Sequence, residues 1–281
     1  MRVARTVREI REIVTEERRA GKNVGFVPTM GYFHEGHLSL IKRAKSENEF
    51  VIVSIFVNPT QFGIGEDYEA YPRDLEKDSK LAESAGANVI FHPSVQEIYP
   101  QGYKTFVEVE GITSRLCGTS RPGHFRGVTT VVMKLFNIVK PDRVYFGRKD
   151  AQQIAVIQQM VKDLNVDIEI IPCPIIREAD GLAMSSRNTY LNEEERKAAL
   201  VLSQSLFQIE VLIGNGERDA KKVKKLITDI INGEPKAHID YAEVVDSLTL
   251  EEIETIRGDI LIALAVKIGK TRLIDNIRLE V

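Results

Sequence analysis

The sequence VGFVPTMGYFHEGHLSL, Val24–Leu40, decides the fold and places the first candidate functional residues. Its apolar beginning ends at Pro28, small and polar residues follow, and an amphipathic segment starts at about Gly36. We therefore predict a strand, a loop and a helix. His34 and His37 then lie where the loop enters the helix. Because the first N–H groups of a helix are free and its N-terminus carries a partial positive charge, this junction is suited to bind a phosphate.

The composition restricts the possible classes of function. The 281 residues are 43% hydrophobic and 28% charged, which is typical of a globular protein with a sizeable core. A formal net charge of -3 gives no general attraction to nucleic acid or to an anionic membrane, so an anion site must be local. The N-terminus alternates charges and no later apolar run is expected to span a bilayer, so we expect a soluble, cytoplasmic protein. Cys117 and Cys173 lack paired spacing and are expected to be buried free thiols.

Apolar runs that alternate with helical patterns predict a doubly wound α/β domain with a parallel sheet. The run Phe50–Asn58 is apolar almost throughout and rich in β-branched residues, as a strand covered on both faces should be. Further strands are expected at Asn88–His92, Phe106–Glu110, Asp142–Gly147 and Ile168–Pro172, and helices at Thr6–Ala20, Asp74–Ala85, Ile112–Cys117, Gly123–Val139 and Asp150–Leu164.

The pattern changes after Ile176. One long helix is expected at Glu193–Ile213, a second at Asp219–Asn232, and strands at His238–Asp246, Asp259–Ile268 and Arg272–Val281. Helices followed by adjacent strands indicate a small α+β domain rather than further βαβ units. We therefore predict a Rossmann-like domain at residues 1–176 and a smaller C-terminal α+β domain at residues 177–281.

Polar side chains follow three of the predicted strands. Met30, His34 and His37 follow the first strand, Asn58 and Gln61 follow the second, and Gly147–Asp150 follows a later one. Ligands of doubly wound sheets bind outside the carboxyl ends of the strands, so these residues can converge on one crevice. Neither G-x-x-x-x-G-K-[ST] nor G-x-G-x-x-G occurs in the chain, so a phosphate site must be built in another way.

Each of these candidates also has an ordinary structural interpretation. His34 and His37 can stabilise charge on phosphates, but they can equally be surface or capping histidines. A metal site is the weakest alternative, because no nearby cysteine or third histidine completes a ligand set. Lys149 can place a point charge on a phosphate, yet most lysines are solvated surface residues. The amides of Gln61 and Gln153 can recognise hydroxyls and carboxylates, although two surface amides would look the same.

The segment 184–188 follows a polar turn and contains two serines before Arg187. Hydroxyls followed by a guanidinium are suited to clamp a phosphate, whereas the alternative is an ordinary loop between domains. His124 and Arg126 lie in another turn of small residues, and the sequence assigns them no role.

Several motifs together resemble one known family. Pro28–Gly31 followed by His34–His37 resembles the His-x-Gly-His signature of the nucleotidyltransferase superfamily, and Met184–Arg187 resembles its second signature. The resemblance extends over nearly the whole chain and is to the pantothenate synthetase family. It is also carried by the motifs at Asn58–Gly63, Tyr71–Asp74, Gly123–Val128 and Gly147–Gln153.

The resemblance implies ATP-dependent condensation of pantoate with β-alanine to pantothenate, AMP and pyrophosphate, through a pantoyl adenylate. It implies a homodimer, and Mg²⁺ with the ATP, for which Asp74 and Asp78 are available carboxylates. It implies catalytic roles for His34, His37 and Lys149, with His37 as proton donor, and pantoate contacts from Gln61 and Gln153, with β-alanine close to Gln61. The implied ATP contacts are Met30, Gly31, Tyr32, Phe33, His34, Glu35, Gly36, His37, Gly147, Arg148, Lys149, Asp150, Ile176 (through its backbone), Met184, Ser185, Ser186 and Arg187.

Two other functions stay open at this point. One is adenylyl transfer to another small acceptor by the same superfamily, and the other is a nucleotide-sensing protein that binds ATP without turnover. The glutamine pair favours a hydroxy acid as the acceptor. Tyr32-Phe33 and Ala151 depart from the residues that are usual in the family, but neither departure touches a proposed polar role.

Overall fold

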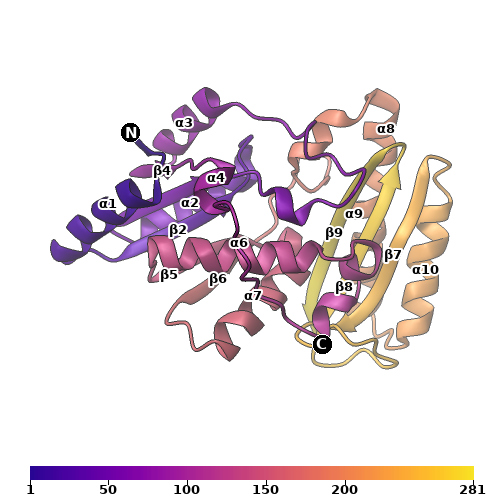
Figure 1. Cartoon of the computed structure of the whole chain (residues 1–281). Coiled ribbons are helices and arrows are strands. Elements are labelled where there is room, and N and C mark those ends of the chain that lie inside the picture. The colour runs from indigo at the N-terminus through magenta and orange to yellow at the C-terminus, as the bar shows by residue number, and fades with distance from the viewer.

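A computed structural model describes all 281 residues, Met1–Val281, and contains two sheets that lie side by side (Figure 1). The larger sheet has six strands in the order β1-β4-β3-β2-β5-β6, and every neighbouring pair is parallel. The smaller sheet has three antiparallel strands in the order β7-β8-β9. The predicted α/β class, with a parallel sheet and a separate smaller sheet near the C-terminus, is confirmed.

The larger sheet and its helices come from the first part of the chain. Its strands are β1 (Arg2–Ala4), β2 (Val24–Thr29), β3 (Phe50–Ile55), β4 (Val89–Phe91), β5 (Arg143–Gly147) and β6 (Glu169–Cys173). Its α-helices are α1 (Val7–Arg19), α2 (Glu35–Glu47), α3 (Leu75–Ser84), α4 (Val95–Ile98), α5 (Cys117–Ser120), α6 (His124–Val139) and α7 (Ala151–Asp163). Short 3₁₀ turns are η1 (Pro59–Gln61), η2 (Ile112–Ser114) and η3 (Arg148–Asp150).

The smaller sheet and its helices come from the rest of the chain. They are η4 (Ser186–Tyr190), α8 (Glu193–Ala198), α9 (Leu200–Gly214), α10 (Ala220–Asn232), β7 (Ala237–Asp246), β8 (Asp259–Ile268) and β9 (Thr271–Glu280). Residues of α9 and α10 share one hydrophobic cluster with this sheet.

Strand β3 shows why the central sheet is stable. All six of its residues are buried, as the continuous apolar run predicts. Ile52 packs into the cluster that contains residues of α1, α6 and α7, whereas Val51 and Val53 pack into the cluster of α2 and α3 on the opposite face. Alternate residues of the strand therefore bury both faces of the sheet.

The strand order places a ligand site at the end of β2. Strands β3 and β4 lie on one side of β2, and β5 and β6 lie on the other, so the direction of the crossovers reverses there.

Gly127 of α6 allows η1, the turn that follows β3, to pack closely against α6. A Cβ atom at position 127 would lie 2.3 Å from the carbonyl oxygen of Thr60, so only glycine lets η1, which carries Gln61, pack this closely.

The predicted strand at Phe106–Glu110 is wrong. This segment has no regular secondary structure and belongs to neither sheet. The N–H of Val107 donates to the hydroxyl of Thr130 at 3.0 Å, and its carbonyl accepts from the hydroxyl of Thr129 at 2.6 Å. Threonines of α6 thus satisfy backbone groups that a sheet would otherwise have paired.

Two further expectations are corrected. The three-residue strand β1 was not predicted, because it is too short to show an alternating pattern. The single helix expected at Glu193–Ile213 is two helices, α8 and α9, which are separated at Ala199.

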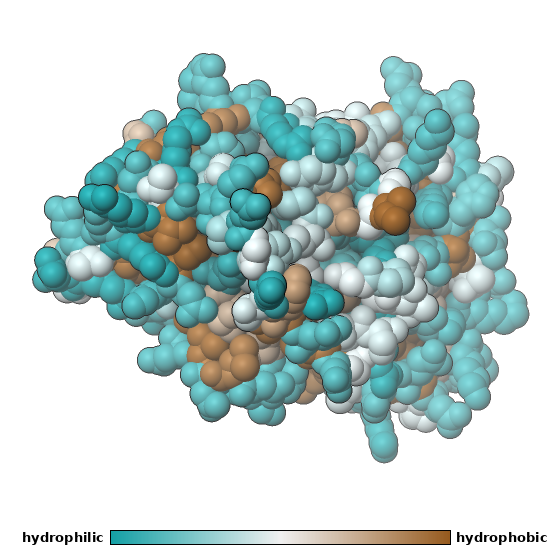
Figure 2. Space-filling view, viewed as in Figure 1, coloured by the Kyte–Doolittle hydropathy of each residue, from teal (hydrophilic) through white to brown (hydrophobic).

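The expectation that no apolar run is long enough to span a membrane is also corrected. By length and composition the helical run Glu193–Gly214 could cross one. In the structure, however, Leu202, Leu206 and Ile209 of this run pack into the hydrophobic cluster beneath the smaller sheet. Figure 2 shows small, separate apolar patches on a largely hydrophilic face.

Candidate active site

A crevice of about 240 Å³ lies at the carboxyl ends of β2, β3 and β5. It brings together most of the residues that the sequence analysis selected. Its walls include Met30, His34, Gly36, His37, Gln61, Gly147, Lys149, Asp150, Gln153, Ile176, Met184, Ser185, Ser186 and Arg187. The candidates outside its walls are Gly31, Tyr32, Phe33, Glu35 and Arg148.

The two histidines cap helix α2 with their own rings. His34 is the N-cap, and its Nδ1 accepts the N–H of Gly36 at 3.1 Å, while Nδ1 of His37 accepts the N–H of His34 at 3.4 Å. The ring centroids are 4.1 Å apart. A Cβ atom at position 36 would lie 2.8 Å from the His34 ring, which explains the glycine of the motif. Since both Nδ1 atoms are acceptors, a neutral ring carries its proton on Nε2, which stays available as a donor.

Both rings are held neutral near pH 7. Burial and the positive charge of Lys149 lower the pKa of His34 to about 4. Burial, the neighbouring His34 and Lys149 lower the pKa of His37 well below its ordinary value. The pair is therefore a set of N–H donors beside a fixed cation, and a bound polyanion would raise both pKa values.

The neutral histidines predict a dependence of stability on pH. The pKa of His34 and that of His124 are both lowered to about 4, by burial first and then by Lys149 and Arg121 respectively, from an ordinary value of 6.5. Between those values the unfolded chain binds more protons than the folded chain, so the free energy of unfolding should fall as the pH decreases through this window.

Urea unfolding at several pH values between about 7 and about 5 measures this effect. His124→Asn should flatten the dependence, whereas the same change at the exposed His238 should leave it intact. Equal slopes in the wild type and in His124→Asn would contradict the assignment.

The loop that leads to His34 is held by Asp78, which the sequence analysis considered only as an available carboxylate. Asp78 is 1% exposed, and it accepts the N–H groups of Tyr32 at 2.6 Å and Phe33 at 2.7 Å. Asp74 caps α3 by accepting the N–H of Lys77. Neither carboxylate lines the crevice, and no group of three or more His, Cys, Asp or Glu side chains could hold a metal ion.

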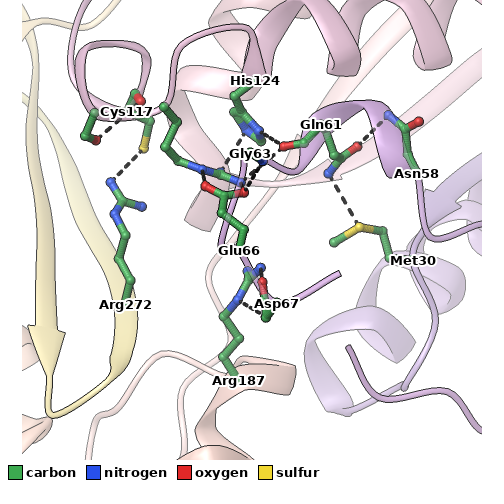
Figure 3. A network of polar contacts seen from close by, with 12 residues as sticks. Met30, Asn58, Gln61, Gly63, Glu66, Asp67, Cys117, His124, Arg187 and Arg272 are labelled. Atoms are coloured by element: carbon green, nitrogen blue, oxygen red, sulfur yellow. Dashed lines mark hydrogen bonds and ion pairs between the residues drawn. The ribbon is translucent and has the colours of Figure 1, made fainter. Parts of the chain in front are cut away.

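Gln61 lines the crevice and lies between Met30 and Asn58 (Figure 3). Its amide donates to Sδ of Met30 at 3.4 Å, and its Oε1 accepts from the amide of Asn58 at 3.0 Å. Asn58 is 1% exposed and also donates to the carbonyl of Gly127. Asn58 was expected near the crevice because it follows the second strand, but no contact with Gln61 was predicted for it. We infer that Asn58 fixes the orientation of the Gln61 amide.

Adjacent glutamines at the start of α7 have different surroundings. Gln152 is buried and bonds to the backbone of Ile112, Arg115 and Cys117. Gln153 instead lines the crevice. The orientation of the helix therefore separates a structural amide from one that can contact a ligand.

The segment Met184–Arg187 packs against the histidine loop. The hydroxyl of Ser186 donates to the carbonyl of Tyr32 at 3.3 Å, and Met184 lies next to Gly36. The segment thus forms one wall of the crevice, at the junction with the smaller sheet.

Two arginines of the crevice are paired with one acidic loop that the sequence analysis missed (Figure 3). Arg187 binds both carboxylate oxygens of Asp67, at 2.9 and 2.8 Å. Arg121 binds both oxygens of Glu66, at 2.6 Å each. Burial alone would raise the pKa of Glu66, but the hydrogen bonds and charge of Arg121 outweigh burial and lower it to about 2. The two loop carboxylates thus form ion pairs with guanidinium groups that could otherwise bind an anionic ligand.

Removing the charge of Asp67 should improve the binding of an anion that Arg187 contacts. For Asp67→Asn we expect the KM for ATP, the nucleotide that the resemblance implies, to fall about fivefold, because a partly exposed pair of this kind contributes roughly 1 kcal/mol. Steady-state kinetics with varied ATP measures the change. Glu69→Gln, in the same exposed loop, is the matched control. An unchanged or raised KM in Asp67→Asn would show that the pair does not compete with the nucleotide.

Comparisons with known proteins agree over the full length. A family model described as Pantoate-beta-alanine ligase matches residues 2–278. The chain is 62% identical over 281 residues to the pantothenate synthetase of Acetivibrio thermocellus, with 100% of both chains covered. It is 58% identical over 276 residues to that of Thermotoga neapolitana, covering 98% of this chain and 99% of the relative.

Solved structures give the same result. The crystal structure of pantothenate synthetase from Thermus thermophilus has a TM-score of 0.94 and 45% identity, with 99% of each chain covered. The pantoate-beta-alanine ligase of Francisella tularensis, complexed with beta-gamma ATP and beta-alanine, has a TM-score of 0.80 and 38% identity, with 99% of this chain and 97% of that chain covered.

Proposed function

This chain belongs to the pantoate-beta-alanine ligase family, and from that membership we propose how its crevice performs the ligase reaction. The reaction is the ATP-dependent condensation of pantoate with β-alanine to pantothenate, AMP and pyrophosphate through a pantoyl adenylate. The observation that supports the proposal is the convergence of two neutral histidines, Lys149 and two glutamines on one crevice at the switch point of the sheet.

In the first step the carboxylate of pantoate attacks the α-phosphorus of ATP. A new P–O bond forms, the bond from the α-phosphorus to the bridging oxygen breaks, and pyrophosphate leaves with the electron pair. The Nε2 protons of His34 and His37 and the charge of Lys149 stabilise the negative charge on the phosphates. His37 is the proton donor, because the triphosphate raises its lowered pKa when it binds.

In the second step the amine of β-alanine attacks the activated carbonyl. The amide bond forms, the bond to AMP breaks, and the amine releases a proton. The amides of Gln61 and Gln153 hold the pantoyl group, and β-alanine enters close to Gln61. Because Asn58 and Met30 engage the Gln61 amide, that side chain is held in place before the substrates arrive.

The residues of the crevice do not build a protein site for Mg²⁺. Asp74 and Asp78 lie outside its walls, and the one carboxylate in its walls, Asp150, is next to Lys149. We propose that Mg²⁺ enters bound to the oxygens of ATP, as this ion commonly does. No step of the mechanism above is assigned to it.

A pyrophosphate-release assay with ATP, Mg²⁺ and pantoate tests the proposed function. Release with pantoate, and formation of pantothenate when β-alanine is added, are the expected results. Release only with another acid would refute the substrate, and tight ATP binding without release would indicate a nucleotide sensor. A parallel assay with a chelator tests the requirement for Mg²⁺.

We also propose that residues 1–176 and 177–281 act as two domains and that ATP draws these domains together. We further propose that the protein is a cytoplasmic homodimer. The contact of Ser186 with the histidine loop supports the proposed closure, since it joins residues 177–281 to the loop that carries His34. Small-angle scattering should show a smaller radius of gyration when ATP is added, and light scattering should give twice the 31.6 kDa mass of the chain. An unchanged radius would argue against closure, and a single-chain mass against the dimer.

A further inference from the structure

Two adjacent buried polar residues, Asp275 and Asn276, lie in the middle of β9 and have no part in the mechanism above. Their exposed fractions are 2% and 5%. Burying a carboxylate and an amide is costly unless every polar atom finds a partner. Their partners therefore indicate why polar side chains occupy these positions.

Asn276 binds the turn that carries Lys149. Its Nδ2 donates to the carbonyl of Arg148 and to the carbonyl of Lys149, each at 2.9 Å. An amide nitrogen has two protons, so one side chain satisfies both carbonyls. The turn η3 has no side-chain cap of its own, and neither has α7, which follows it. The carbonyls on both sides of the Lys149 Cα atom are thus held by a strand of the other sheet.

Asp275 anchors the same strand beside the crevice. Its two carboxylate oxygens bind Arg177 at 2.7 and 3.0 Å, and Arg177 directly follows Ile176 of the crevice wall. One of these oxygens also accepts the N–H of Asn276 at 2.8 Å. The backbone of Asn276 is therefore fixed relative to the crevice. If η3 were displaced, the Asn276 amide could not easily move with it.

We propose that Asn276 is a positioning residue of the adenylation step, which orients Lys149 toward the phosphates by holding the carbonyls on either side of it. This rests on the proposed role of Lys149. The smaller sheet then contributes to the chemistry through the backbone of η3, in addition to the wall formed by Met184–Arg187. The competing explanation is a structural staple between the two sheets that has no influence on Lys149.

The variant Asn276→Asp separates shape from hydrogen bonding. It keeps the size of the side chain but places carboxylate oxygens against two carbonyl oxygens, so η3 must move. We expect the single-turnover rate of adenylate formation to fall roughly 10²-fold, the loss expected of a displacement of about 1 Å at a catalytic group. The KM for pantoate should change little. Asn137→Asp, an exposed amide that donates to a carbonyl within α6, is the matched control and should retain the wild-type rate.

A double-mutant cycle with Lys149→Met distinguishes positioning from stapling. If Asn276 acts through Lys149, the double variant should be no slower than Lys149→Met alone. If the rate losses of the two single variants multiply in the double variant, the proposal is wrong. A normal rate in Asn276→Asp would also overturn it. Asn276→Ala, which removes the donors without repulsion, should show the same non-additivity if Asn276→Asp proves too unstable to measure.

One readout is independent of activity. Because the charge of Lys149 lowers the pKa of His34, a displaced Lys149 should raise that pKa in Asn276→Ala, and NMR titration of the His34 ring measures it. If Lys149→Met turned over normally, the proposed function of Lys149 would fail, and this titration would still decide the positioning role. A His34 pKa equal to that of the wild type would overturn it.

Discussion

His37→Ala should slow the formation of pantoyl adenylate by roughly 10²- to 10⁴-fold, the range expected when a proton-transfer group is lost. The structure sets the state of this ring before ATP binds, and bound triphosphate must raise its pKa before it can transfer a proton. Its Nδ1 is occupied by the N–H of His34, so its proton is on Nε2, and the ring is neutral because burial, His34 and Lys149 lower its pKa. A single-turnover measurement with ATP and pantoate reports this step without β-alanine.

Alanine also removes part of the helix cap, which costs about 0.5–2 kcal/mol of stability and complicates the result. Two other variants separate the functions of the ring. His37→Asn can still accept the N–H of His34 but has no donor at the Nε2 position. His37→Gln can place an amide N–H there but cannot transfer a proton. A slow His37→Asn with a stable fold is expected.

Recovery of the single-turnover rate in His37→Gln would indicate that a hydrogen bond from the Nε2 position is sufficient for the reaction. No recovery would indicate that proton transfer is required. The exposed His238→Asn is the control for losing a histidine elsewhere. A near-normal single-turnover rate in both His37→Ala and His37→Asn would exclude the proposed role.

The histidine motif shows how much of the site could be predicted from the sequence. The strand, the loop and the helix were predicted from local patterns, and α2 begins at Glu35, one residue before the predicted start at about Gly36. Capping and phosphate binding were weighed as alternatives, but the structure makes them compatible. Each ring caps the helix through Nδ1, and a neutral ring keeps its proton on Nε2.

Other parts of the site could not be predicted, because they depend on residues far apart in the chain. Asp67 and Arg187 are separated by 120 positions, and Asn276 and Lys149 by 127. No periodicity or spacing connects such pairs, since they form only when the two sheets pack. The wrong strand at Phe106–Glu110 has a similar cause, because threonines of α6 bind its backbone in place of a neighbouring strand.

Lys149→Met should lower the rate of adenylate formation by about 10²- to 10³-fold, comparable to the loss of one preorganised group that stabilises transition-state charge. Methionine preserves the length and apolar stem of the side chain while removing its charge. Lys149 pairs only loosely with Asp150, at 3.8 Å, and no buried network depends on it. The free energy of unfolding should therefore change by no more than about 0.5 kcal/mol. Lys162→Met, at an exposed lysine near the end of α7, the helix that follows η3, is the control.

The charge of Lys149 has a second consequence that the same variant tests. Because this charge lowers the pKa of both His34 and His37, its removal should raise both values. Protonation of the rings would then begin at a higher pH, and the acidic limb of the pH–rate profile should shift to higher pH. A normal rate would exclude the catalytic role, and an unfolded variant would make Lys149 structural. A slow, folded variant with an unshifted acidic limb would mean that Lys149 binds phosphate without tuning the histidines. The full pH profile of Lys149→Met therefore separates the two effects of one charge, on the phosphates and on the rings that bind them.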